Sequence, residues 1–194
     1  MARSTGGPLR ADAQRNRDKI LAAAVRVFTE EGLNAHLERI AKEAGVGSGT
    51  LYRNFPTREI LIEAAYRNEL AKLCDAVPEL LEAMPPREAL RAWMGCFIDY
   101  ATAKLGMADA LRALVEAGAN PYAQSKELML AALTELLDAG AKAGTIREDI
   151  GADDMFAALT GIALASGKPD QREQAERLLD LTLDGLRPGI RGSG

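Results

Sequence analysis

Apolar side chains recur at helical spacing along almost the whole of this 194-residue chain, and this periodicity is its strongest constraint. Ile20, Ala24 and Phe28, for example, fall on one face of a helix, with charged residues elsewhere around it. β-branched residues are sparse, and no segment alternates as a strand would. The sequence therefore predicts an all-α protein.

Glycine, proline and capping residues divide the chain into about nine helices with short connections. Pro56 and Thr57 separate the third helix from the fourth, which Pro78 is expected to interrupt or end. Asp170 and Glu173 have the spacing of a capping box before the last helix. The predicted helices are 12–31, 37–44, 48–54, 58–77, 86–104, 107–117, 120–142, 153–166 and 170–187.

The composition is that of a globular protein, with 47% hydrophobic and 27% charged residues. Residues 1–10 lack the apolar stretch of a secretory signal, and the longest uncharged run, 155–167, is too short for a membrane span. Cys74 and Cys96 match no metal-ligand spacing and are expected in the core. We therefore expect a cytoplasmic protein with no membrane segment, metal or cofactor.

Charge is unevenly distributed along the chain. Through Arg58 there are ten Lys and Arg against six Asp and Glu, whereas the remainder has fourteen against twenty-two. A basic N-terminal part on an acidic body suits a polyanionic partner that only the N-terminal part binds. A surface that is patchy by chance is the alternative.

Segment 37–55 has the features of two short helices that meet at a steep angle. Gly45 permits the positive φ of the corner, and the second helix opens with small polar residues before Tyr52, Arg53 and Asn54. Small residues let a helix end approach DNA, Arg and Asn can read base edges, and a Tyr hydroxyl can bind a phosphate. The segment therefore indicates a helix-turn-helix, although a tight corner inside a helical bundle would share the glycine turn.

Several separate blocks of the N-terminal part belong to one recognisable pattern. They are 20–24 (ILAAA), 28–32 (FTEEG), 40–46 (IAKEAGV), 49–55 (GTLYRNF) and 56–61 (PTREIL). With these blocks, the sequence from about residue 16 to residue 65 closely resembles the DNA-binding domain of the TetR family. The blocks match in order and at the right separations, which makes the resemblance specific; the rest of the chain resembles the family only as a divergent helical bundle.

The resemblance implies two domains. A helix-turn-helix DNA-binding domain is expected over residues 12–57, with the motif itself at about 37–55. A helical domain for ligand binding and dimerisation is expected over 58–188. The end segments 1–11 and 189–194 are expected to be flexible.

The resemblance also implies the residues that contact DNA. Tyr52 stands at the family's phosphate-contacting tyrosine, and Arg58 at the lysine that begins the fourth helix and clamps the DNA backbone. His36 departs from the pattern, because threonine or proline usually starts the second helix and histidine caps it less well. The expected DNA contacts are Ser48, Gly49, Thr50, Tyr52, Arg53, Asn54, Arg58, Arg15, Arg17 and Lys19, with a solvated helix start as the alternative for the last three.

The C-terminal two-thirds contains two further sets of candidate residues. A packed core is the simpler interpretation of its aromatic and methionine residues, but the resemblance implies a ligand pocket lined by Trp93, Phe97, Tyr100, Met107, Leu111, Met129, Leu133 and Phe156. The last two helices carry small residues and leucines that suit close helix packing, either within the subunit or between subunits. The resemblance implies a dimer interface that includes Ala158, Gly161, Ile162, Ala165, Leu179, Leu183 and Leu186.

The predicted function is therefore that of a ligand-responsive repressor. As a homodimer it would bind double-stranded operator DNA and be released by a small-molecule effector. An enzyme is disfavoured, because the sequence has one histidine and no nucleophile motif, Gly-rich phosphate loop or metal-ligand spacing; we expect no catalytic residue. A helical interaction protein without DNA binding is a second alternative, against which Tyr52, Arg53 and Arg58 argue.

Overall fold

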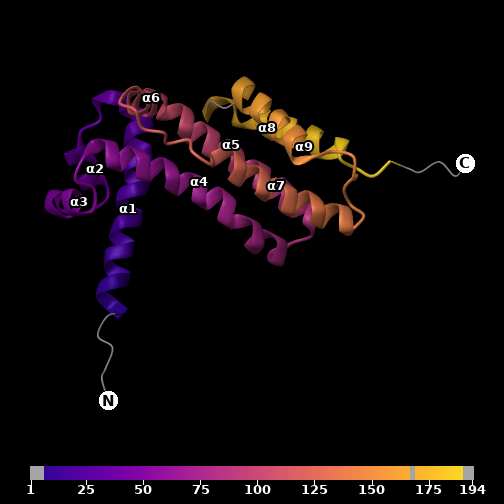
Figure 1. Cartoon of the computed structure of the whole chain (residues 1–194), viewed down its shortest axis with the longest axis horizontal. Coiled ribbons are helices and arrows are strands. Elements are labelled where there is room, and N and C mark those ends of the chain that lie inside the picture. The colour runs from indigo at the N-terminus through magenta and orange to yellow at the C-terminus, as the bar shows by residue number, and fades with distance from the viewer. Residues whose placement is uncertain (1–6, 167–168, 190–194) are drawn as a thin grey trace, which may run out of the picture. The chain divides into compact units, whose positions relative to one another are not determined.

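The computed structural model describes residues 7–166 and 169–189, and the side chains of 11–32, 34–166 and 170–189. Within these residues the chain forms nine α-helices, two short 3-10 helices and no strand (Figure 1), which confirms the predicted all-α fold. In chain order they are α1 (Gly7–Glu31), η1 (Gly32–Asn34), α2 (Leu37–Glu43), α3 (Ser48–Asn54), α4 (Arg58–Ala83), α5 (Pro86–Gly106), α6 (Ala108–Glu116), α7 (Ser125–Lys142), α8 (Ala152–Ser166), η2 (Pro169–Gln171) and α9 (Arg172–Gly185).

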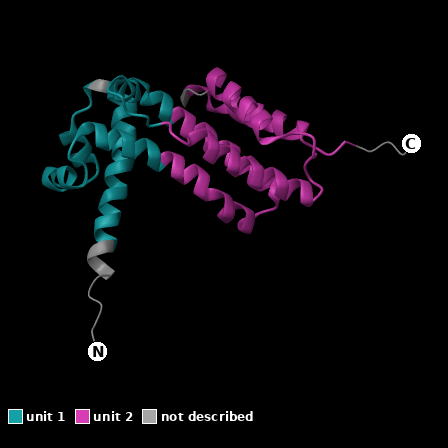
Figure 2. Cartoon of the chain, viewed as in Figure 1, with its two compact units in different colours: residues 1–68, 103–121 teal, residues 69–102, 122–194 magenta. Residues whose placement is uncertain are grey.

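The helices form two compact units, coloured separately in Figure 2. Unit 1 comprises residues 1–68 and 103–121, and unit 2 comprises 69–102 and 122–194. Both α4 and α5 begin in one unit and continue into the other, and α6 belongs with the N-terminal helices. This division differs from a single boundary at residue 57, because α6 packs against η1.

The core of unit 1 forms where α1 packs against α2 and α2 against α3. Ile20, Ala24 and Phe28 are fully buried on one face of α1, as their spacing predicts. Val27 shares that face and is also fully buried, whereas Val25 is only half-buried. Other large side chains that are fully buried in unit 1 include Ile40, Leu51, Phe55 and Leu61.

In unit 2, α7 packs against α8 and α8 against α9. The indole of Trp93 is fully buried and donates a hydrogen bond of 2.8 Å to the backbone carbonyl of Leu73. The rings of Phe97, Tyr100 and Phe156 continue the cluster, with neighbouring ring centroids 6.0–6.2 Å apart. These contacts tie α4, α5 and α8 together, since aromatic pairs at this separation attract.

Ion pairs join α5 to α9 where the two helices run alongside each other. Arg87 pairs with Asp184 at 3.0 Å, and Arg91 pairs with both Glu176 and Asp180 at 2.5 and 2.6 Å. Farther along, Arg172 of α9 pairs with Asp99 of α5 and with Glu176. We call these residues (Arg87, Arg91, Asp99, Arg172, Glu176, Asp180 and Asp184) the α5–α9 ion pairs.

Three predicted helix boundaries are wrong. Helix α4 continues past Pro78 to Ala83, because proline removes only one backbone hydrogen bond and Val77 before it stays buried in the core. Helix α7 starts at Ser125 rather than near residue 120, since Gln124 has the left-handed φ of 64°. The Asp170 capping box does not form, because η2 intervenes and the N-cap of α9 is Gln171.

Part of the N-terminal segment is helical, although it was expected to be flexible. Helix α1 begins at Gly7, inside the segment 1–11 that was expected to be flexible. The predicted tails 1–6 and 190–194 lie outside the described residues.

Candidate nucleic-acid interface

The corner between α2 and α3 has the geometry that the sequence predicts. Gly45 has a φ of 69°, a conformation that would be strained for any residue with a side chain. Its N–H donates to the carbonyl of Lys42 at 3.1 Å, and the N–H of Val46 donates to that of Ala41 at 3.0 Å. These two bonds form a Schellman motif, which ends α2 and turns the chain into α3. Leu51 is fully buried beneath the corner.

One face of α3 is open to solvent. Ser48, Gly49, Tyr52 and Arg53 are exposed on it. A Cβ built on Gly47 or Gly49 meets no atom within 4 Å, and neither glycine has a positive φ. Neither packing nor backbone conformation therefore requires glycine at these two positions. What they share is a bare backbone at the start of α3, which an external partner can approach closely.

The two polar side chains at the end of α3 are hydrogen-bonded to their own helix. Arg53 donates from Nε to the carbonyl of Gly49 at 3.1 Å and from Nη2 to Thr50 Oγ1 at 3.3 Å. Because Arg53 is exposed, its donors can exchange these acceptors for others at little cost. Asn54 donates from its amide to the carbonyl of Thr50 at 2.8 Å and is partly buried, so it is the less available of the two.

Tyr52 extends from α3 toward α2. Its side chain is 43% exposed, and its hydroxyl donates to Oε1 of Glu38 at 3.2 Å. The negative charge of Glu38 raises the pKa of Tyr52 above its ordinary value of 10.0. At neutral pH the phenol is therefore protonated and is a hydrogen-bond donor.

Arg58, at the first position of α4, holds the chain that enters α2. Its guanidinium donates to the backbone carbonyls of Ala35 at 2.5 Å and Gly32 at 3.1 Å, and lies 5.2 Å from the ring centroid of Phe28. The side chain is partly buried. Sequence reasoning expected a phosphate contact here and missed this positioning role, which no periodicity or motif signals.

Helix α4 is capped as predicted. The hydroxyl oxygen of Thr57 accepts a hydrogen bond from the N–H of Ile60 at 3.3 Å. His36 precedes α2 with extended backbone and makes no side-chain cap bond, in agreement with the expectation that it caps poorly. Among the described residues no three His, Cys, Asp or Glu side chains form a group that could hold a metal ion.

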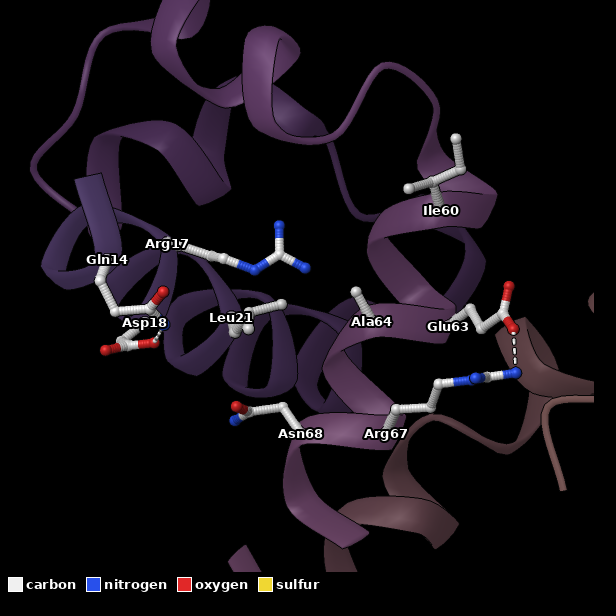
Figure 3. A pocket seen from close by; sticks show the side chains of 9 residues that line it. All are labelled: Gln14, Arg17, Asp18, Leu21, Ile60, Glu63, Ala64, Arg67 and Asn68. Atoms are coloured by element: carbon white, nitrogen blue, oxygen red, sulfur yellow. Dashed lines mark hydrogen bonds and ion pairs between the residues drawn. The ribbon is translucent and has the colours of Figure 1, made fainter. Parts of the chain in front are cut away.

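Three basic residues of α1 were expected near DNA, and the structure gives each a different setting. Arg17 lies over the ring of Phe55, with its guanidinium carbon 4.6 Å from the centroid. It also lines a pocket of about 410 Å³ between α1 and α4, whose residues are drawn in Figure 3. Arg15 forms an ion pair with Asp12 one turn away, whereas Lys19 is exposed and makes no ion pair within the described residues.

Ion pairs connect α1 to α2, the first helix of the helix-turn-helix. Arg26 of α1 pairs with Glu43 at 2.6 Å, and Arg39 of α2 pairs with Glu30 at 2.5 Å and with Glu31. These cations are neutralised within unit 1. Fewer of the ten Lys and Arg residues counted through Arg58 are therefore available to bind an external polyanion.

The residues predicted to bind a ligand fall into two groups. The first group lies in unit 2 and comprises the aromatic cluster of Trp93, Phe97, Tyr100 and Phe156, and Met129 and Leu133 of α7. Met107 and Leu111, at α6, belong to unit 1. Phe156 is half-buried and the other seven residues are buried, so in this structure they serve as core.

The residues predicted at the dimer interface also divide into two groups. Ala158, Gly161 and Ala165 of α8 are exposed, and Leu183 of α9 is half-buried. Ile162, Leu179 and Leu186 are buried within the subunit. Sequence reasoning missed Leu164 and Leu181, which are 75% and 70% exposed. The sequence contains a signal for them, since neither leucine falls at the helical spacing of the residues that face the core. Large apolar side chains outside that spacing indicate an interaction surface.

Neither cysteine is buried in the core, although both were expected there. Cys74 is half-buried, and burial raises the pKa of its thiol to about 11. Cys96 is exposed on α5. In the described part of the chain, none of the helices combines the length and the apolar character that a membrane span requires.

Comparison with known proteins places both parts of the chain. Residues 20–65 match the model of bacterial regulatory proteins of the tetR family, and residues 85–188 match the C-terminal domain of SbtR-like transcriptional regulators. An HTH-type transcriptional regulator from Staphylococcus aureus is 43% identical over 63 residues, which are 32% of this chain and 34% of that protein. The chain thus spans about a third of the length of the curated relatives that it matches.

Two solved structures match over nearly the whole chain. A TetR transcriptional regulator from Streptomyces coelicolor has 75% sequence identity and a TM-score of 0.87, and the match covers 90% of this chain and 99% of that one. A TetR transcription regulatory protein from Mycobacterium vanbaalenii has 37% identity and a TM-score of 0.76, with 93% and 99% covered. With its helix-turn-helix of α2 and α3 and its all-helical C-terminal part, the chain therefore belongs to the TetR family of DNA-binding transcriptional regulators.

Proposed function

We propose that this regulator is a repressor that binds a pseudo-palindromic operator as a homodimer and leaves it when a small molecule binds. The observation that carries the proposal is the open face of α3, where Gly47 and Gly49 leave bare backbone beside the exposed Arg53. A helix with these properties fits the major groove, with its start close to the DNA and its arginine reaching base edges. Such a protein works in the cytoplasm, where bacterial DNA is.

Exposed apolar side chains on α8 and α9 support the proposed homodimer. Leu164 and Leu181 have most of their surface in solvent, and the small residues Ala158, Gly161 and Ala165 on α8 allow a second helix to approach closely. A two-fold axis through this face would join four helices. On the operator, the two copies of α3 would enter major grooves about 34 Å apart, one turn of B-DNA.

The effector is proposed to bind among the apolar residues of unit 2, around Trp93, Phe97 and Phe156, and to open the packing there. Helix α4 offers a route to the DNA-binding end, because one continuous helix begins at Arg58 in unit 1 and continues into unit 2. The effector can release DNA only if it binds more tightly to the conformation in which the two recognition helices are wrongly spaced.

The test is selection of binding sites from a random duplex library, followed by affinity measurements on the selected site. We expect a sequence with two-fold symmetry. Arg53→Ala should weaken binding by about 10- to 100-fold and relax the preference at particular base pairs, as expected for loss of a base contact worth about 1–3 kcal/mol. Arg112→Ala is the matched control, since Arg112 is an exposed arginine of α6 paired with Asp109. Failure to select any sequence would contradict the proposal, and so would an equal effect of the two variants.

A further inference from the structure

Glu38 is placed where a negative charge opposes DNA binding. It lies in the first turn of α2, is exposed, and accepts the hydrogen bond from Tyr52. Segment 37–55 has two carboxylates, and the other, that of Glu43, is neutralised by Arg26 at 2.6 Å. Glu38 forms no ion pair within the described residues. The exposed part of the helix-turn-helix therefore carries one uncompensated negative charge, directly beside Tyr52.

The hydrogen bond from Tyr52 to Glu38 is weak enough for another acceptor to replace Glu38. A hydroxyl that donates to a carboxylate usually lies about 2.5–2.7 Å from it. Here the separation is 3.2 Å, and both side chains are exposed to water. A tyrosine hydroxyl has a single proton to donate. It can bond the carboxylate of Glu38 or a DNA phosphate, but not both.

We propose that Glu38 is a selectivity residue that competes with DNA phosphates for the hydroxyl of Tyr52. This inference rests on the proposed function, in which Tyr52 contacts the DNA backbone. On arbitrary DNA the bond to Glu38 persists and its charge repels the phosphates, so loose binding is weak. On the operator, the base contacts of α3 hold the backbone close enough for a phosphate to displace Glu38. Glu38 thereby widens the difference between operator and non-operator DNA.

Helix stability is the other reason for an acid at this position, because a carboxylate in a first turn interacts favourably with the helix dipole. The two roles predict different results for Glu38→Gln. A purely structural role lowers the stability of unit 1 and does not improve DNA binding. The selectivity role strengthens binding to arbitrary DNA, since glutamine is uncharged and is a weaker competitor for the hydroxyl.

The test compares Glu38→Gln with Glu43→Gln, which removes the same charge from the same helix but does not touch Tyr52. Affinity for a duplex of arbitrary sequence is measured at low and at high salt. Glu38→Gln should bind about 2- to 5-fold more tightly than the wild type at low salt, an effect of the size expected for one exposed charged contact, and screening should reduce the gain at high salt. Glu43→Gln should gain less. In a Tyr52→Phe background the gain from Glu38→Gln should shrink.

A second readout does not depend on DNA. The charge of Glu38 raises the pKa of Tyr52, so Glu38→Gln should lower that pKa toward 10.0, whereas Glu43→Gln should leave it in place. NMR titration of the tyrosine rings measures this, with Tyr52→Phe to assign the signal.

The results separate the two proposals. If the wild type binds DNA but Glu38→Gln gains no more than Glu43→Gln, or gains equally in the Tyr52→Phe background, Glu38 has no selectivity role. An unchanged Tyr52 pKa in Glu38→Gln would also overturn the inference. If folded wild-type protein binds no duplex at all, the proposed function fails and the inference fails with it.

Discussion

Gly49 is a residue whose identity the protein's own packing does not explain. Its Cβ position is open and its backbone is ordinary helix, so Gly49→Gln should fold. Because glycine is a poor helix former, the free energy of unfolding should stay the same or rise by up to about 1 kcal/mol. The added side chain should hold α3 away from the groove and weaken operator binding at least about tenfold, near 1.4 kcal/mol.

Thermal unfolding and operator titration of Gly49→Gln check both expectations. Gly185→Gln is a control, since a Cβ at Gly185 in α9 also meets nothing within 4 Å. Unchanged operator affinity in Gly49→Gln would mean that α3 does not approach DNA through this residue.

Arg58 tests whether the start of α4 acts by geometry or by charge. Arg58→Ala removes donors to the carbonyls of Gly32 and Ala35 and the contact with Phe28, so it should destabilise the fold by about 1–3 kcal/mol and weaken DNA binding. Arg58→Lys keeps the charge but cannot donate through two nitrogens in the same fork. We expect it to restore little of the lost stability in chemical denaturation. Full recovery of stability and binding by lysine would favour a simple phosphate contact instead.

At the scale of single residues, the sequence predicted the exposure of side chains better than it predicted their hydrogen-bond partners. The chemistry of Arg53 and Tyr52 indicates DNA contacts, and both are exposed. Their bonds to Gly49, Thr50 and Glu38 could not be predicted, because they depend on side-chain rotamers and on the angle between α2 and α3.

At the scale of elements, glycine and proline predicted the helix boundaries well wherever backbone conformation alone determines where a helix ends. The bounds of α3 agree with the prediction at both ends, since the positive φ of Gly45 ends α2 before it and Pro56 disfavours helical backbone at Phe55 after it. The signals failed where packing overrides local preference. Pro78 is tolerated inside α4, and η2 replaces the expected cap at Asp170.

The α5–α9 ion pairs make unit 2 sensitive to acid. The hydrogen bond from Arg91 is the main reason that the pKa of Glu176 lies below its ordinary value of 4.5. Folded protein thus binds this proton more weakly than the unfolded chain does, and the stability that Glu176 contributes is present above pH 4.5 and lost as the pH falls through the lower, folded value.

Melting temperatures of the wild type and Glu176→Gln across this acid range measure the contribution. The variant should be less stable near neutral pH and should lose less stability on acidification. Parallel curves for the two proteins would mean that the Arg91–Glu176 pair does not form in solution.

At the scale of the whole molecule, the exposed leucines of α8 and α9 predict the oligomeric state. Leu164→Arg and Leu181→Arg change side chains that make little contact within the subunit, so the monomer should stay folded. Both variants should sediment as monomers and lose operator binding. Leu128→Arg, at a leucine of α7 that is 46% exposed, should remain dimeric. A dimer that survives both changes would place the interface elsewhere.

The central claim is that α2 and α3 present a DNA-reading surface in a two-fold symmetric regulator. Fluorescence anisotropy with the regulator's selected operator, against a scrambled duplex and across a salt series, tests it most directly. We predict tight binding to the operator with two protomers per site, and weaker binding to the scrambled duplex that falls steeply as salt displaces the phosphate contacts. A folded dimer that binds the two duplexes equally, or binds neither, would contradict the claim.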